Sequence, residues 1–343
     1  MNCDAGTVND QSKVEISVLV MAYNRLQFLP FALDSLERQT FPKEKFEVIL
    51  ITGFDPYGKV HYPAGLSIKV GICHDENMGA LLVRGLQLAR GEIICILDDD
   101  DLFHEEKLSH VYEMFKRTSN LGFYRNNLDF IDKYGRSRKD PTPSHRKVIA
   151  QKHIILTSLN DKDCIVKLWR ADAYFNNSSI QFRRCILSRY INYIRRVRFG
   201  LDFLLFYLSI LSGFDLLADD FQLTHYRIHD TNFSYKTTPL KSYSLLSSSF
   251  AFIKKISSGK NNMVRTHASI LLNVSKVFLL HQLCINNTLP FRRIFRQFLK
   301  DDRDGILIFI RSHRYFSLYA LLLLILGCFF GGKKQFLRLV ANV

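Results

Sequence analysis

The chain has 343 residues and a net charge of +15, with 47% hydrophobic and 23% charged residues. This balance is that of an ordinary globular protein with one large or two ordinary domains. It excludes a disordered or fibrous chain and a protein that crosses a membrane many times. The charge is uneven, because residues 1–135 carry a net charge of −6 and residues 136–343 a net charge of +21. We therefore expect the two parts to face different partners, with phosphate groups as one candidate for the basic part.

The seven cysteines are scattered without a C-x-x-C pair, and the first 14 residues lack the apolar run of a secretory signal. An odd number of cysteines in this arrangement indicates neither a zinc ribbon nor a disulfide framework. We expect a reducing, cytoplasmic location.

Short apolar runs alternate with helical patterns along the first hundred residues. Four runs predict strands: 16–20, 46–51, 67–72 and 92–97. Two stretches with apolar residues at helical spacing predict helices: 28–36 and 79–89. Strands that alternate with helices form a parallel sheet, whose binding crevice lies at the carboxyl ends of the strands. The sequence therefore predicts an α/β, Rossmann-like unit in which the loops that begin at Ala22, Thr52 and Asp98 converge.

The composition changes in the second half of the chain. Residues 136–160 are polar and basic, which predicts a long surface loop, and residues 231–300 contain no Asp or Glu. Helical patterns recur in this basic stretch. We expect residues 239–343 to form a basic, hydrophobic helical extension.

Four consecutive aspartates, Asp98 to Asp101, directly follow the fourth predicted strand. In an extended segment, side chains two residues apart point the same way, so Asp98 and Asp100 can share one task. Carboxylate oxygens suit Mg²⁺ or Mn²⁺, which keep open positions for substrate phosphates. The alternative is an acidic loop in which Asp101 caps a helix over 102–115.

Three segments together resemble the inverting, GT-A-fold glycosyltransferases of family 2. They are residues 17–25 (SVLVMAYNR), residues 77–84 with Asn77, Gly79 and Arg84, and residues 89–101 (ARGEIICILDDDD). Their order within about 90 residues makes coincidence improbable. The resemblance covers residues 14–234 and implies a GT-A catalytic domain over residues 1–238.

The resemblance implies an enzyme that moves a sugar, of the hexosyl type, from a nucleotide diphosphate sugar to an acceptor hydroxyl. A divalent cation, Mg²⁺ or Mn²⁺, would sit on Asp98, Asp100 and His229. The implied nucleotide-sugar site comprises Ala22, Tyr23, Asn24, Arg25, Thr52, Asp55, Asn77, Gly79, Arg84, Asp98 and Asp99.

Asp202 matches the position of the family's catalytic base. Family members usually carry a pair of acids there, whereas this chain has Leu201 before Asp202. A carboxylate isolated among apolar residues has a raised pKa and can accept a proton from an acceptor hydroxyl. The alternative is an N-capping aspartate of a helix over 203–211.

Residues 226–234 (YRIHDTNFS) resemble the closing motif of the family, in which a histidine lies near the diphosphate. His229 takes this role by resemblance. Arg227 is a candidate for contacting the diphosphate or for a structural role on the surface.

The turn after the second strand departs from the family pattern. Members usually have an aspartate there that contacts the nucleotide base, whereas this chain has Thr52 and, three residues later, Asp55. Either residue is a candidate for recognising the base. Asp55 can equally be a turn residue before Pro56.

Residues 183–198 carry six arginines interleaved with apolar residues, between the acidic run and Asp202. This amphipathic pattern fits a glycan or phospholipid-linked acceptor or an anionic membrane surface. A solvated helix face that packs on the core is the alternative.

Residues 315–332 are uncharged and flanked by basic residues. Eighteen residues are at the lower limit for crossing a hydrocarbon layer of about 30 Å. We favour peripheral or monotopic attachment to the cytoplasmic face of the membrane over a spanning helix or a helix buried in the fold.

Two functions of other classes compete with catalysis. A nucleic-acid-binding protein would explain the basic charge, but no recognised nucleic-acid module accompanies it, so nucleic acid is not an expected partner. A catalytically silent member that binds a sugar nucleotide or scaffolds a membrane complex would explain Leu201 and the altered turn at 52–55.

Overall fold

The computed structural model describes residues 14–138 except 24 and 76, then 153–157, 161, 164–165, 167–168, 171, 173–232, 249–259, 264–265 and 268. The chain divides into two compact units, Met1–Asn232 and Phe233–Val343. In the second unit, residues 249–256 form a helix that buries Phe250 and Ile253. The apolar stretch 315–332 lies outside the described residues. Within the described part of the chain, no helix is both long and apolar enough to cross a membrane.

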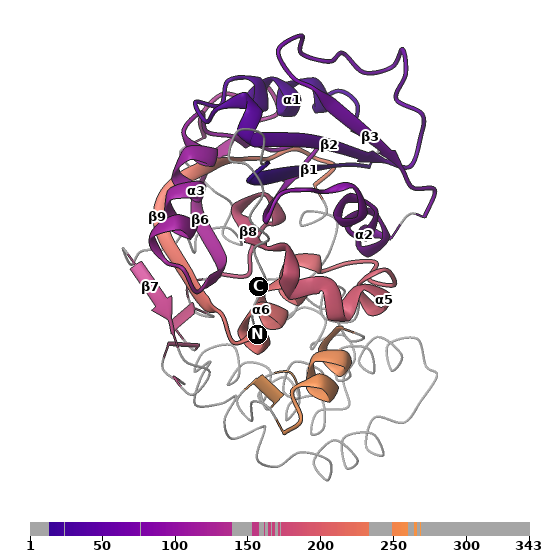
Figure 1. Ribbon diagram of the computed structural model, residues 1–343. Helices are drawn as coiled ribbons and strands as arrows, with labels where there is room; N and C mark the ends of the chain where they lie inside the picture. The colour runs from indigo at the N-terminus through magenta and orange to yellow at the C-terminus, as the bar shows by residue number, and fades with distance from the viewer. Residues whose placement is uncertain are drawn as a thin grey trace, which may run out of the picture. The chain divides into compact units, whose positions relative to one another are not determined.

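One mixed sheet organises the first unit (Figure 1). In the described residues it has nine strands in the order β3-β2-β1-β4-β8-β6-β9-β5, with β7 paired to β9. The strands are β1 (Ile16–Ala22), β2 (Phe46–Thr52), β3 (Ile68–Ile72), β4 (Ile93–Asp98), β5 (Leu102–Phe103), β6 (Leu121–Ile131), β7 (His153–Leu156), β8 (Ile180–Arg183) and β9 (Asp215–Arg227). The first four are parallel, whereas β8 lies antiparallel between β4 and β6.

Helices cover both faces of this sheet, which confirms the predicted α/β architecture. Helices α1 (Leu29–Glu37) and α3 (Lys107–Arg117) share one apolar core with alternate residues of β1, β2 and β4. Helix α2 (Met78–Leu88) lies on the other face, where Gly85 approaches Leu19 and Ile51. Helix α6 (Leu201–Ser212) covers the same face further along, with Phe206 against Phe123. Both faces of β1 and β2 are therefore buried, as their nearly continuous apolar runs predict.

Two expectations about local structure are wrong. Residues 102–103 do not begin a helix; they pair with β9 as the short strand β5, and α3 begins only at Lys107. Asp101 therefore caps no helix there. In the predicted loop over 136–160, residues 153–156 form β7 against β9. Tertiary pairing overrides local sequence preference in both places.

The order of the strands reverses at β1. This strand lies between β2 and β4, because the chain moves outward through β2 and β3 and then returns to the other side of β1. Met21 near the end of β1 pairs with Asp98 at the end of β4. In open α/β sheets, ligands bind at such a reversal of strand order. The segments that follow β1 and β4 are thus side by side.

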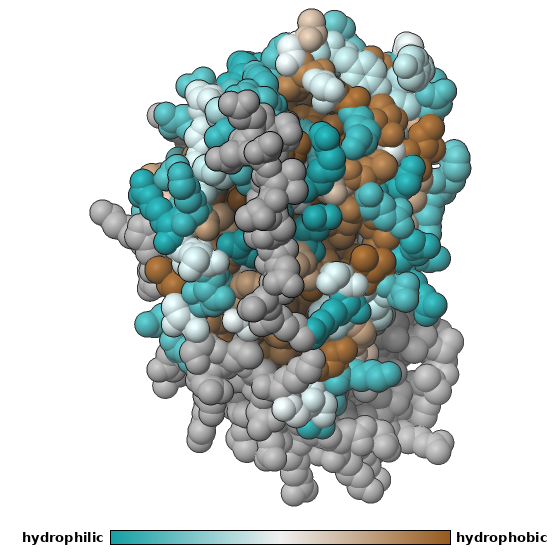
Figure 2. All heavy atoms as spheres, viewed as in Figure 1, coloured by the Kyte–Doolittle hydropathy of each residue, from teal (hydrophilic) through white to brown (hydrophobic). Residues whose placement is uncertain are grey.

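On the surface, hydrophobic and hydrophilic residues are interspersed over the face seen in Figure 2. The large apolar side chains that the described residues expose belong to several elements: Leu26, Phe31, Tyr57, Ile72, Tyr134, Ile155 and Phe221. Apolar residues scattered in this way are normal for a folded domain.

Candidate active site

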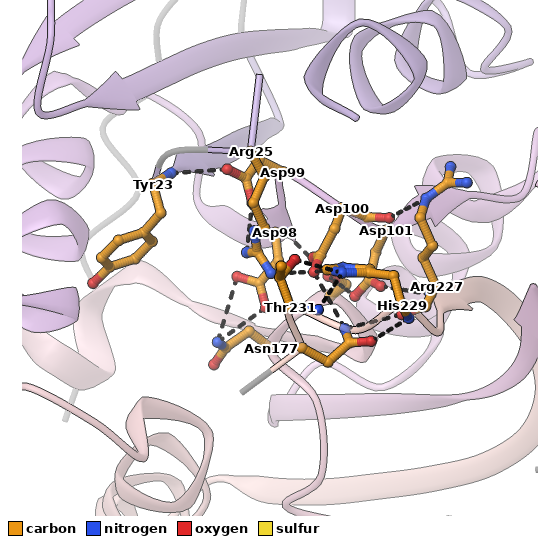
Figure 3. Close-up of polar contacts among 12 residues, drawn as sticks. Tyr23, Arg25, Asp98, Asp99, Asp100, Asp101, Asn177, Arg227, His229 and Thr231 are labelled. Atoms are coloured by element: carbon orange, nitrogen blue, oxygen red, sulfur yellow. Dashed lines mark hydrogen bonds and ion pairs between the residues drawn. The ribbon is translucent and has the colours of Figure 1, made fainter. Parts of the chain in front are cut away.

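The segments that follow β1 and β4 are joined by hydrogen bonds and ion pairs (Figure 3). The backbone N–H of Tyr23 donates to Oδ2 of Asp99 at 2.9 Å. The guanidinium of Arg25 lies 2.5 Å from Oδ1 of Asp99 and also forms an ion pair with Asp100. These contacts bring together residues that the sequence predicts at one site and that are about 75 positions apart in the chain. Asn24, between them, lies outside the described residues.

Burial and the neighbouring carboxylates raise the pKa of Asp98. Its carboxyl lies deep in the fold beside those of Asp101 and Asp100, so burial first and the two neighbouring carboxylates next raise its pKa well above the usual range. The amide of Asn177 faces both carboxylate oxygens, with the closer contact at 3.3 Å. A cation beside Asp98 would lower this pKa again.

His229 contacts Asp100 although the two residues are far apart in sequence. Its Nε2 lies 3.0 Å from Oδ2 of Asp100, while its Nδ1 accepts a hydrogen bond from the backbone N–H of Thr231 at 3.2 Å. Because Nδ1 is an acceptor, the ring hydrogen is on Nε2 and points at the carboxylate. Asn232 also reaches this oxygen, at 3.4 Å.

The donor types at this edge fit a divalent cation, although the side chains are engaged with one another. Asp98 and Asp100 offer carboxylate oxygens and His229 offers an imidazole nitrogen, which are ligands for Mg²⁺ or Mn²⁺. In the described residues, no group of three or more His, Cys, Asp or Glu side chains is gathered around one point. Arg25 neutralises Asp100 in this arrangement. For Asp100 and His229 to hold a metal ion, the Arg25 guanidinium would leave Asp100, and the ring hydrogen of His229 would move from Nε2 to Nδ1.

Arg227 is buried rather than at the surface, with 2% of its side chain exposed. Its Nε donates to the carbonyl of Asp100 at 2.8 Å, and its backbone N–H donates to Asp101 at 3.0 Å. The guanidinium lies 5.0 Å from the ring centre of Phe28. Arg227 therefore holds the acidic loop in place by hydrogen bonds to Asp100 and Asp101.

Asp202 is the second residue of α6 and not its cap, since Gly200 precedes the helix. Burial raises the pKa of Asp202 to about 6, although hydrogen bonds from the backbone N–H groups of Phe203, Asn176 and Asp202 itself partly lower it. A carboxylate with this pKa is ionised at neutral pH and is a stronger base than an exposed aspartate. Leu201, where the family has a second acid, is fully buried.

The other predicted nucleotide-sugar residues lie at separate places. Ala22 ends β1 and is buried, and Thr52 closes its own turn by hydrogen bonds with Phe54. Asp55 is exposed and accepts from the backbone N–H of Tyr57 at 3.1 Å, as a turn residue does. The structure thus favours the turn interpretation for Asp55.

Asn77, Gly79 and Arg84 belong to α2. Asn77 precedes the helix, and the backbone N–H of Gly79 donates to the carbonyl of Val197 at 2.8 Å. A Cβ on Gly79 would lie 1.6 Å from the carbonyl oxygen of Ile194, so only glycine permits this approach. Arg84 lies over Gly71 of β3.

A group of residues that no sequence motif indicated also holds the aspartates. Asn176 donates to Asp101 at 2.9 Å, and Ser178 donates to the same oxygen at 2.7 Å. Lys107, which is fully buried, donates to the carbonyl of Ser178. The signal in the sequence was the run of four polar residues at 176–179, directly before β8 (Ile180–Arg183). Polar side chains are costly to bury unless they form hydrogen bonds.

Comparison with known proteins finds similar glycosyltransferases. The model of the family described as Glycosyl transferase family 2 matches residues 17–174. An uncharacterized glycosyltransferase of Haemophilus influenzae is 32% identical over 111 residues, which cover 32% of this chain and 37% of that protein. The amylovoran biosynthesis glycosyltransferase AmsB of Erwinia amylovora is 28% identical over 118 residues, covering 32% and 38%. The match therefore spans less than two fifths of each relative's length.

Solved structures share the fold at low sequence identity. S. aureus TarS 1–349 in complex with UDP superposes with a TM-score of 0.54 at 17% identity, over 76% of this chain and 70% of that one. The mannosyltransferase PcManGT from Pyrobaculum calidifontis, in complex with GDP-Man and Mn²⁺, gives a TM-score of 0.51 at 15% identity, over 92% and 87%. These likenesses show the GT-A glycosyltransferase fold.

Proposed function

Residues 17–174 belong to glycosyl transferase family 2, and on this premise we propose that the protein transfers a sugar from a nucleotide diphosphate sugar to an acceptor hydroxyl, with inversion at the anomeric carbon. The observation that carries the proposal is the acidic loop at the carboxyl end of β4, which Tyr23 and Arg25 contact from the end of β1. This is the crevice where an α/β sheet of this topology binds its ligand.

The donor occupies this crevice. Ala22, Tyr23, Asn24 and Arg25 after β1, with Asp98 and Asp99 after β4, form its inner part, and Thr52, Asp55, Asn77, Gly79 and Arg84 form its outer part. The related folds were solved with UDP, UDP-GlcNAc and GDP-Man, which are nucleotide diphosphates or their sugars. The same class of donor is proposed for this chain.

Asp98, Asp100 and His229 would hold a divalent cation, Mg²⁺ or Mn²⁺. The PcManGT structure contains Mn²⁺, and the donor types here suit the same class of ion. When bound, the cation would supply positive charge to the departing diphosphate. Until then, Arg25 and the N–H of His229 offset the charge of Asp100.

Asp202 acts as the general base. The acceptor oxygen forms its bond to the anomeric carbon while the bond from that carbon to the diphosphate breaks, and the hydroxyl proton moves to Asp202. Attack from the side opposite the leaving group inverts the anomeric centre. Burial of Asp202 supports this role, because a pKa of about 6 leaves it ionised yet basic at neutral pH.

The acceptor is a glycan or a phospholipid-linked molecule. Five arginines between β8 and α6 are exposed: Arg184, Arg189, Arg195, Arg196 and Arg198. The last three precede Asp202 by four to seven residues, in the segment that leads to the proposed base. Arg183 pairs instead with Glu92. This basic surface supports an acceptor with phosphate groups and attachment of the catalytic domain, residues 1–238, to an anionic membrane on the cytoplasmic side through the extension at 239–343.

A catalytically silent sugar-nucleotide-binding protein is the second candidate. The buried Leu201, in place of an acid, and the outward-facing Asp55 favour it. In that case the protein would bind the nucleotide sugar but would not transfer the sugar.

A donor panel separates the two functions. The full-length protein is incubated with UDP- and GDP-sugars, Mn²⁺ or Mg²⁺, and acceptors with and without phosphate groups. Release of a nucleoside diphosphate and a product one sugar heavier by mass spectrometry are expected, with Asp100→Asn as the inactive control. Donor binding without release from any donor would contradict catalysis and support the silent protein.

A further inference from the structure

Residues 176–179, here called the polar strip, connect two of the four aspartates to each other. Asn176 and Ser178 both donate to Oδ2 of Asp101, at 2.9 and 2.7 Å. Ser178 Oγ also accepts from the backbone N–H of Asp98 at 3.0 Å, and Asn177 donates to the Asp98 carboxylate. The polar strip therefore fixes both the backbone and the side chain at the start of the acidic loop.

The same strip reaches the proposed base. The backbone N–H of Asn176 faces the carboxylate of Asp202 and is one of the groups that lower its pKa. Asn176 has a φ of 70°, which is rare for a residue with a side chain and is found where the surrounding structure holds the backbone in place. One residue in a strained conformation thus joins Asp101 to Asp202.

Lys107 holds the polar strip from inside the fold. Its Nζ donates to the carbonyl of Ser178 at 2.5 Å and to Oγ1 of Thr224 at 2.7 Å, and it lies 3.9 Å from the ring centre of Phe103. The side chain is fully buried. Thr224 itself donates to the Ser178 carbonyl at 3.2 Å. Lys107 on α3 and Thr224 on β9 therefore both donate hydrogen bonds to one carbonyl group of the polar strip.

Stability does not account for a lysine in this place. The groups that Lys107 touches among the described residues are a carbonyl, a hydroxyl and an aromatic ring, none of which is an anion. Burying an amine without a contacting carboxylate is unfavourable, and an apolar side chain of the same shape often serves a core equally well. What an apolar side chain cannot do is fix the Ser178 carbonyl by hydrogen bonding.

We propose that Lys107 is a positioning residue for sugar transfer, which acts through the polar strip to set the geometry of the acidic loop and of Asp202. Without the Lys107 bond, the Ser178 carbonyl keeps only the longer bond from Thr224, and the strip shifts. Asn176 then donates less well to Asp202, and Asn177 and Ser178 hold Asp98 less firmly. This inference rests on the proposed function for the identity of the base, but the contacts that carry it are independent of turnover.

The first test compares Lys107→Met with Lys116→Met, an exposed lysine on the same helix. Lys107→Met is expected to fold with an unchanged or higher Tm, to lower kcat by about 10- to 100-fold and to change KM for the donor by less than about threefold. Lys116→Met is expected to match the wild type. Wild-type kcat in folded Lys107→Met would overturn the proposal, and so would a loss of activity that only follows a loss of folded protein.

The second test measures the pKa of Asp202 directly, by NMR titration of protein with ¹³C-labelled aspartate carboxyls, and Asp202→Asn assigns the signal. Because hydrogen bonds to the ionised form lower a pKa, Lys107→Met is expected to raise the pKa of Asp202 by about 0.5 to 1 unit. Thr224→Val removes the other hydrogen bond to the Ser178 carbonyl and is expected to raise the pKa of Asp202 as well. This variant replaces Lys107→Met in the test if Lys107→Met does not fold. An unmoved pKa in both variants would overturn the inference. Since this titration needs no substrate, a wild-type protein without turnover contradicts the proposed function alone.

Discussion

The imidazole Nε2 of His229 lies 3.0 Å from Oδ2 of Asp100, across 129 positions of the chain. This contact joins the end of β9 to the acidic loop after β4. His229 is 7% exposed and Asp100 is 4% exposed, so water competes weakly for this hydrogen bond. Any change at His229 is therefore transmitted to the carboxylate that we assign to the cation.

His229→Ala is expected to raise the Mn²⁺ concentration for half-maximal transfer by about 10- to 100-fold, because the cation loses one ligand and Asp100 loses a hydrogen bond. Chelation with EDTA should abolish transfer by the wild type, and added Mn²⁺ should restore it. His225→Ala is the control, since His225 lies on β9 and pairs with Asp129 instead. An unchanged Mn²⁺ requirement in His229→Ala would exclude it as a ligand.

Asp202→Asn is expected to lower kcat by about 10²- to 10⁴-fold while donor binding, measured by calorimetry, stays within about twofold. In the wild type, the active form has Asp202 ionised. Because its pKa is about 6, kcat should fall roughly tenfold per pH unit below pH 6 and level off above it. Asp215→Asn, at the start of β9, should retain the wild-type profile. A wild-type kcat that is constant down to pH 5 would contradict the assignment.

Lys107 makes the free energy of unfolding depend on pH. Burial lowers its pKa to about 7, whereas the charges of Cys95 and Asp101 oppose this and that of Arg125 adds to it. The unfolded lysine keeps a pKa near 10.5, so between pH 7 and 10.5 the unfolded state binds more protons. The stability of the wild type relative to Lys107→Met should therefore rise with pH in this window, by up to about 1.4 kcal/mol per unit. Urea unfolding at pH 7, 8 and 9 measures the difference, and a constant difference would contradict the lowered pKa.

Gly79→Ala is expected to destabilise the protein by about 1–3 kcal/mol, because the new methyl group collides with the Ile194 carbonyl and pushes residues 194–197 away from α2. Gly53→Ala is the matched control, since a Cβ there would meet its nearest atom at 3.5 Å, an ordinary contact. Thermal unfolding measures both. Equal Tm values for the two variants would show that the segment moves aside without cost.

Sequence patterns were sufficient for the parallel half of the sheet and for the acidic loop. The four predicted strands match β1 to β4 within two residues. β1, β2 and β4 are buried on both faces and leave nearly continuous apolar runs, whereas β3 is half-exposed and has a weaker pattern. The strand order beyond β4 left no such trace. β8 has only four residues and β5 two, so their pairing depends on contacts with β4, β6 and β9 rather than on local preference.

The polar strip and Lys107 could not be predicted for a related reason. A lysine in the first turn of an amphipathic helix is normally exposed, and only the packing of β9 and the strip around α3 buries it. The positive φ of Asn176 likewise follows from contacts with Asp101 and Asp202, not from its neighbours in sequence. Asp55 shows the opposite case, since its turn is local and the sequence indicated it.

The antiparallel insertion of β8 between β4 and β6 also sets when the site can form during folding. The acidic loop follows β4 at residue 98, but its partners come from the polar strip before β8 and from the end of β9, about 80 and 130 positions later. Contacts so distant in sequence carry the loop-closure cost that slows folding. During synthesis, the four carboxylates therefore lack most of their hydrogen-bond donors. The complete set of contacts around the acidic loop can form only after residue 232 has left the ribosome.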